Sequence, residues 1–109
     1  MSTRLRGAKV NVVDLQLRAK CIAKLLKAMS NERRLLILHH LAAKERSVSE
    51  LVELVGLSQS AMSQHLARLR HDGLVTPRRS RQTIHYSLKG TIPAALLGVL
   101  SKVFAAHPE

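Results

Sequence analysis

Residues 48–88 read VSELVELVGLSQSAMSQHLARLRHDGLVTPRRSRQTIHYSL, and this stretch decides the fold. Ser47 precedes it and can cap a first helix, because Glu50 follows at the spacing of a capping box. Gly56 is expected to end that helix, since glycine adopts the left-handed conformation without strain. The apolar stripe of this helix consists of Leu51, Leu54 and Val55. The pattern predicts a short helix followed by a tight turn.

A second helix is predicted from its cap at Ser58 to about His71. Met62, Leu66 and Leu69 recur at helical spacing and form one narrow buried stripe. The opposite side lacks the Glu and Lys of an ordinary surface helix. Its outward residues are Ser60, Ser63, Gln64, Ala67 and His71. Short, uncharged polar groups suit close approach to base edges in a major groove, so this helix is the predicted recognition helix.

A basic hairpin follows the second helix. Asp72-Gly73 ends the helix, and two strands are predicted at Val75–Arg79 and Gln82–Leu88 around a tip at Ser80-Arg81. Three arginines stand at or beside this tip, namely Arg78, Arg79 and Arg81. A helix-turn-helix followed by such a hairpin is a winged helix, which is a DNA-binding design.

Charge and composition favour the same function. The 109 residues carry 18 Lys and Arg against 7 Asp and Glu, a net charge of +11, so a polyanion is the natural partner. One cysteine, Cys21, cannot form an intrachain disulfide, which favours a reducing cytoplasm. We expect no membrane-spanning helix and no secretory signal. The chain offers no nucleophile motif and no Gly-rich phosphate loop, so an enzyme is not expected.

The chain resembles the ArsR-type winged-helix regulators, and the branch that holds NolR and HlyU in particular. The residues that carry the resemblance are LLKAMSNERRLLIL at 25–38, SVSELVELVGLSQSAMSQHLARLRHDGLV at 47–75 and QTIHYSL at 82–88. The resemblance covers roughly residues 20–104. It implies a mainly helical fold with a small hairpin, in the order four helices, two strands and a final helix.

The resemblance also implies a homodimer of single domains spanning residues 1–109. Helices 14–29 and 92–106 are the expected dimerisation helices, and both carry broad apolar faces that a monomer would expose.

Residues 1–10 are expected to form a flexible arm. Ser30 and Thr91 are the expected caps of the second and last helices. The helix that follows Ser30 is apolar nearly all round through Leu35, Leu36, Ile37, Leu38 and Leu41, and is expected to be buried.

The predicted function is that of a dimeric repressor that binds an inverted-repeat operator in double-stranded DNA. Base readout is assigned to Gln59, Ser60, Ser63 and Gln64, because amide and hydroxyl groups pair with base edges. Ser58 is assigned mainly to capping. Phosphate or minor-groove contacts are assigned to Arg68, Arg78, Arg79, Arg81 and Gln82.

For two further residues, the sequence leaves two different roles open. Arg33 and its neighbour Arg34 stand at a helix start, which disfavours cations, so Arg33 contacts a phosphate or forms a salt bridge with Glu32 or Glu53. His65 lies about 60° from the centre of the buried stripe, and is either a half-buried structural residue or a base or phosphate contact.

A function as a metal or redox sensor is an open alternative to constitutive repression. Some relatives bind metal through a Cys-x-Cys at the start of the helix-turn-helix, but residues 47–50 of this chain contain no thiol. Other relatives use Asp and His on the last helix, where this chain offers only His107. Thiol sensors of the HlyU-like branch use two cysteines, and the matching positions here are His39 and about Ala105. No metal or cofactor is therefore predicted, and Cys21 is expected to be a small buried residue.

The alternatives to a repressor are a redox- or metal-responsive sensor and a sequence-indifferent nucleoid-type protein. The second of these would not need an uncharged polar helix face.

Overall fold

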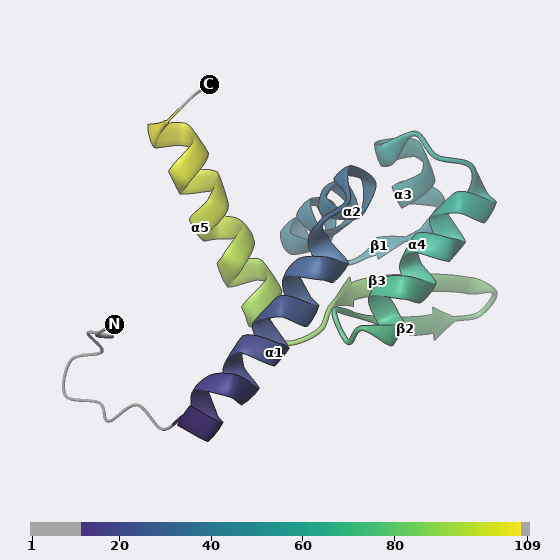
Figure 1. Cartoon of the computed structure of the whole chain (residues 1–109). Coiled ribbons are helices and arrows are strands. Elements are labelled where there is room, and N and C mark those ends of the chain that lie inside the picture. Colours follow the sequence, from purple (N-terminus) through teal and green to yellow (C-terminus); the bar gives the residue numbers. More distant parts are fainter. Residues whose placement is uncertain (1–11, 108–109) are drawn as a thin grey trace.

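The computed structural model describes residues 12–107 and has a winged-helix body from which two helices project (Figure 1). The elements in chain order are α1 (Val12–Met29), α2 (Glu32–Ala43), β1 (Arg46–Ser47), α3 (Val48–Val55), α4 (Gln59–His71), β2 (Val75–Ser80), β3 (Thr83–Leu88) and α5 (Ile92–Ala106). The hairpin β2–β3 extends from one side of the body, and α1 and α5 extend from the other. The predicted arm 1–10 lies outside the described residues.

The predicted helix-turn-helix is confirmed in its caps. The Ser47 backbone N–H donates to Glu50 Oε1 at 2.9 Å, and the Glu50 N–H donates to Ser47 Oγ at 3.1 Å. These reciprocal bonds form a capping box at the start of α3. Gly56 ends α3 in the left-handed conformation, with φ of 79°. Both the predicted capping box and the predicted glycine stop of α3 are therefore present.

The core lies between α2, α3, α4 and the sheet. Its largest fully buried side chains are Ile37, Leu38, Leu51, Met62, Leu66, Leu69 and Val75. The predicted buried stripe of α4 is thus confirmed. The expected burial of α2 and of the α3 stripe holds only in part, because Leu35 and Leu36 are each 37% exposed and Leu54 is 45% exposed. In a single chain, those sides of α2 and α3 face solvent.

The sheet has three antiparallel strands in the order β1-β3-β2, where the sequence predicted a hairpin alone. The additional strand β1 is only Arg46–Ser47, in a segment too short and too polar to give a period-2 pattern. The turn is also shifted by one residue. Ser80 pairs with Thr83, so the tip is Arg81-Gln82 and Gln82 is not in a strand. Arg81 adopts φ of 59°.

Two expected caps are corrected. Asn31, rather than Ser30, caps α2, and its Oδ1 accepts from the Arg34 backbone N–H at 3.0 Å. The Ser30 hydroxyl instead donates to the Lys27 carbonyl at 2.9 Å, at the end of α1. Thr91 occupies the cap position of α5, but its side chain makes no capping bond.

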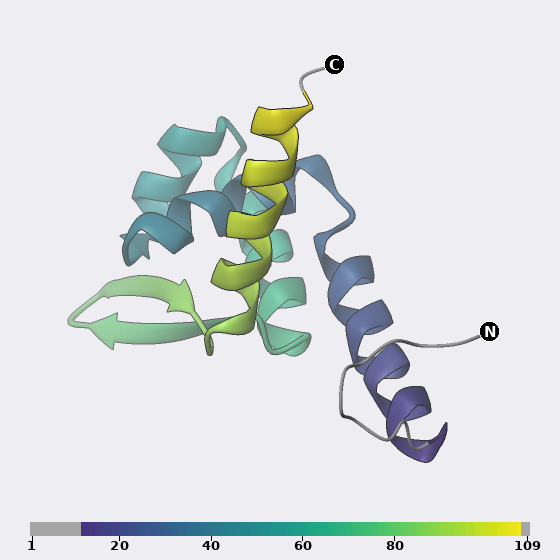
Figure 2. The ribbon, with the colours of Figure 1, turned by 90° about the vertical axis from the view of Figure 1, so that its left-hand side faces the viewer.

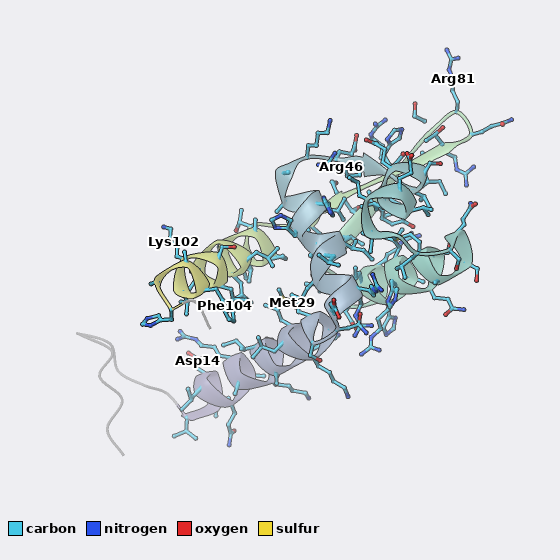
Figure 3. The ribbon with its side chains drawn as sticks, turned by 90° about the horizontal axis from the view of Figure 1, so that it is seen from above. Asp14, Met29, Arg46, Arg81, Lys102 and Phe104 are labelled. Atoms are coloured by element: carbon cyan, nitrogen blue, oxygen red, sulfur yellow. The ribbon has the colours of Figure 1, made fainter. Side chains whose placement is uncertain are left out.

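The helices α1 and α5 diverge from the body (Figure 2). Both helices leave apolar side chains exposed. The exposed residues are Val12, Val13, Leu15, Leu17, Ile22 and Leu26 on α1, and Ile92, Val99, Leu100, Val103 and Phe104 on α5. Phe104 lies on the side of α5 that faces α1, and Lys102 lies on the other side (Figure 3). The predicted exposure of the terminal apolar faces in a single chain is therefore present.

Candidate nucleic-acid interface

The outer face of α4 is built as an exposed polar surface over a buried apolar stripe. Gln59, Ser60, Ser63 and Gln64 are all exposed, while Met62, Leu66 and Leu69 on the other side are at most 1% exposed. Ser58 Oγ accepts from the Ala61 backbone N–H at 3.1 Å, which confirms its capping role. The four predicted base-reading residues are thus free to meet a ligand, and their roles remain predictions.

A hollow separates α4 from the wing. Its larger part, about 400 Å³, is lined by Val48, Ser63, Leu66, Ala67, Arg70, His71, Ile84 and Tyr86. An adjoining part of about 230 Å³ is lined by Val48, Ser49, Gln59, Ser63, Gln82, Thr83 and Ile84. The hollow therefore brings the predicted residues Gln59 and Ser63 of the helix together with Gln82 of the wing. Sequence reasoning missed Ser49, Thr83, Ile84 and Tyr86; the alternation of Ile84 and Tyr86 along the strand was the available signal.

The three wing arginines do not share one position. Arg81 lies at the far end of the hairpin and points away from the body (Figure 3). Arg79 pairs with Ile84, which lines the hollow. Arg78 instead pairs with His85 and forms an ion pair with Glu45, with Nη2 and Oε1 2.8 Å apart. The predicted arginine cluster is therefore divided between different parts of the wing.

Other basic residues make bonds to the ends of helices. Arg33 Nη1 donates to the Val55 carbonyl at 3.2 Å, and Arg34 Nε donates to the Ala28 carbonyl at 2.6 Å. Arg46 Nε donates to the His40 carbonyl at 3.3 Å. The last carbonyls of a helix lack intrahelical partners and carry partial negative charge.

These bonds explain the two arginines at the start of α2. Within residues 12–107, the Arg33 side chain bonds to the last carbonyl of α3 and forms neither of the two predicted salt bridges. A phosphate contact by Arg33 remains a prediction. Arg68, another predicted phosphate contact, forms an ion pair with Asp72, with Nε and Oδ2 2.9 Å apart.

His65 is half-buried on the side of α4 that faces α2. Burial lowers the pKa of His65 below the ordinary histidine value, and the positive charges of Arg34 and Arg33 lower it further. Because its charged neighbours belong to α2, the geometry favours the structural interpretation of His65 over a DNA contact.

The described residues 12–107 contain no group of three or more His, Cys, Asp or Glu that could hold a metal ion. Within the same range, no helix has both the length and the hydropathy to cross a membrane. Cys21 is exposed, contrary to the expectation of burial. It lines a cavity of about 320 Å³ between α1, the turn after α4 and the start of α5.

Sequence comparison identifies the protein family that this chain resembles. A family model described as "Bacterial regulatory protein, arsR family" matches residues 31–76. The transcriptional activator HlyU of Vibrio cholerae is 46% identical over 100 residues, which cover 92% of this chain and 93% of HlyU. The nodulation protein NolR of Rhizobium meliloti is 48% identical over 86 residues, which cover 79% of this chain and 70% of NolR.

Solved structures agree with the sequence comparison. Reduced HlyU from Vibrio cholerae superimposes with a TM-score of 0.79 at 46% identity, covering 84% of this chain and 96% of HlyU. The homodimeric winged helix-turn-helix DNA-binding domain of Mb0332 from Mycobacterium bovis gives a TM-score of 0.77 at 29% identity, covering 94% of this chain and 93% of that domain.

Proposed function

The chain belongs to the ArsR family of bacterial regulatory proteins, and on that basis we propose that it is a homodimeric transcriptional repressor of the bacterial cytoplasm that binds an inverted repeat in double-stranded DNA. The observation that carries the proposal is the exposed, uncharged polar face of α4 beside an arginine-tipped hairpin. A helix with this face reads base edges in the major groove, and the hairpin contacts the adjacent backbone or minor groove.

The dimer is part of the proposal. The domain of Mb0332 is homodimeric, and the exposed apolar faces of α1 and α5 would be covered by a second copy of the chain. Two recognition helices related by a two-fold axis lie about one turn of DNA apart, roughly 34 Å, so each half-site receives one α4.

Base recognition is assigned to Gln59, Ser60, Ser63 and Gln64. The amide of a glutamine pairs bidentately with adenine, and serine hydroxyls donate or accept. The wing residues Arg79 and Arg81 supply sequence-independent attraction to the DNA. Repression follows from occupancy, because a bound dimer excludes other proteins from the operator.

Selection of bound sequences from a random DNA pool, run with and without reductant, tests the proposal. The expected result is an inverted repeat that competes with random DNA by ~10³-fold or more. A pool without enrichment would favour the sequence-indifferent, nucleoid-type alternative. A site recovered only in one redox condition would favour the sensor alternative through Cys21.

Substitution of Gln64 by Ala isolates the reading role. Affinity for the selected operator should fall by ~1–3 kcal/mol while affinity for random DNA stays the same. Reporter transcription from the operator then separates repression from activation. The relative HlyU of Vibrio cholerae is described as a transcriptional activator.

A further inference from the structure

One ion pair joins the wing to the loop that precedes the sheet. Arg78 Nη2 donates to Glu45 Oε1 at 2.8 Å, and Arg78 Nε donates to Glu45 Oε2 at 3.1 Å. Both carboxylate oxygens are thus engaged by two nitrogens along one edge of the guanidinium, a bidentate geometry. Glu45 belongs to the segment between α2 and β1, and Arg78 belongs to the outer strand β2.

The strand register separates Arg78 from its neighbour Arg79. Directly paired residues of antiparallel strands share a face, and successive residues alternate between faces. Arg79 pairs with Ile84, which lines the hollow beside α4. Arg78 pairs with His85, one residue further along β3, and His85 pairs with Ser47 of β1. Arg79 therefore lies on the face of the wing that faces the recognition helix, and Arg78 lies on the opposite face.

The ion pair also occupies the edge of the guanidinium that binds anions. A bidentate contact to a phosphate would use two neighbouring N–H groups, as the contact with Glu45 does. The hydrogen bond from Arg78 holds the pKa of the Glu45 carboxyl below its ordinary value, and the charge of Arg78 acts in the same direction. Glu45 is ionised at neutral pH, as an exposed carboxyl ordinarily is, so opposite charges hold the pair together.

We propose that Arg78 is not a DNA contact, and that Arg78 and Glu45 form a clamp that positions the wing so that Arg79 and Arg81 meet the DNA. The clamp bridges from the α2–β1 segment to β2 across β3, and β1 itself contributes only two paired residues to the sheet. Core packing of Val75, Tyr86 and Leu88 and the pairing of β3 with β1 hold the base of the hairpin, and the clamp at Arg78 is an additional contact toward its tip. Glu45 is thus a positioning residue, and this inference rests on the proposed DNA-binding function.

Salt dependence distinguishes a clamp from a phosphate contact. The affinity of the full-length protein for a random-sequence duplex is measured over a series of salt concentrations. Arg79→Ala and Arg81→Ala should each flatten the slope of log affinity against log salt by ~0.9. Arg78→Ala and Glu45→Ala should leave the slope unchanged. A flattening by Arg78→Ala equal to that of Arg79→Ala would overturn the clamp.

Operator affinity provides the second readout. Arg78→Ala and Glu45→Ala should each weaken operator binding by about two- to fivefold, the size expected of an exposed ion pair, and the double variant should be no weaker than either single variant. Arg78→Lys keeps the charge but loses the bidentate geometry, so it should behave like Arg78→Ala. An increase in affinity with a steeper slope in Glu45→Ala would contradict the clamp, because it would mean that Arg78 had been released onto a phosphate.

The exchanged pair Glu45→Arg with Arg78→Glu restores the ion pair at the same net charge and should recover operator affinity; failure to recover it in a folded protein would contradict the clamp. Circular dichroism spectra establish folding for each variant. Absence of DNA binding by the unmodified protein would instead refute the proposed function, so the two failures are distinguishable.

Discussion

The body of the molecule and its two terminal helices present opposite surfaces. In the body, Ser47 and Ser58 cap the starts of α3 and α4. The apolar stripe of α4 is buried, and that of α3 is buried except for Leu54. In α1 and α5, large apolar side chains are exposed, among them Leu17 at 57% and Phe104 at 66%. The body buries its core within one chain, whereas the terminal helices leave their apolar faces exposed. The difference supports the proposed dimer, in which a second chain would cover the terminal helices.

The largest expected effect comes from a charge on the apolar face of α5. Phe104→Glu should separate the dimer and reduce operator affinity on the order of 100-fold or more, because two linked half-sites bind far more tightly than one. Lys102→Glu, on the other side of α5, is the control and should remain dimeric although it changes the charge further. Analytical ultracentrifugation and gel-shift titration measure both properties. A dimeric Phe104→Glu protein with full affinity would refute the division between body and terminal helices.

A pair of leucines in α3 tests the core of the body. Leu51→Ala should lower the free energy of unfolding by roughly 2–5 kcal/mol, because Leu51 is fully buried. Leu54→Ala removes the same atoms from a side chain that is 45% exposed and should cost less than about 1 kcal/mol. Urea denaturation at one fixed protein concentration measures the difference, since dimer stability depends on concentration. Equal losses would mean that Leu54 is buried in the assembled protein.

Helix caps give a smaller contrast between the two regions. Ser58→Ala should reduce stability by ~1 kcal/mol, because the Ala61 N–H loses its acceptor. Thr91→Ala, at the cap position of α5, should have little effect, since the Thr91 side chain makes no capping bond. Thermal unfolding monitored by circular dichroism compares the two. A larger loss for Thr91→Ala would show that this side chain has a role in the dimer.

The smallest effect is a pH dependence. Because burial lowers the pKa of His65 in the folded state, the unfolded state takes up a proton first as pH falls through the ordinary histidine pKa of about 6.5. Stability should therefore decline with acidification in this window, and His65→Gln should remove part of the decline. His71→Gln, at an exposed position of the same helix, is the control. Denaturation midpoints between neutral pH and mildly acidic pH measure the effect, and identical profiles for His65→Gln and the unmodified protein would contradict it.

Local signals predicted the helix-turn-helix well. The capping box, Gly56, the Ser58 cap and the buried stripe of α4 all act within a few residues, so the sequence pattern contains them. The exposure of Gln59 and Gln64 follows from that stripe by geometry. The position of the wing tip was wrong by one residue, because Arg81 adopts a left-handed conformation that is usual for glycine and uncommon for arginine.

Contacts between distant segments could not be predicted. The strand β1 forms only because Arg46 and Ser47 meet His85 and Tyr86, far along the chain. The partner of Arg78 is 33 residues away, and the partner of Arg33 is 22 residues away. The sequence predicted a DNA contact for Arg78 and either a phosphate contact or a salt bridge for Arg33, and only the tertiary arrangement shows the acceptor of each. Basic charge in this chain is therefore partly structural, which net charge alone does not reveal.

Arg81 at the tip of the hairpin adopts a left-handed backbone conformation that disfavours residues with a side chain. Among the described residues, Arg81 is the only residue other than glycine that has a positive φ. A side chain in this conformation costs on the order of 1 kcal/mol relative to the ordinary backbone regions. Arg81→Gly should relieve this cost and yet weaken attraction to DNA. Protein stability and affinity for DNA thus oppose each other at position 81. A higher melting temperature together with a lower affinity for DNA in Arg81→Gly would identify the guanidinium as the reason the fold tolerates the strain.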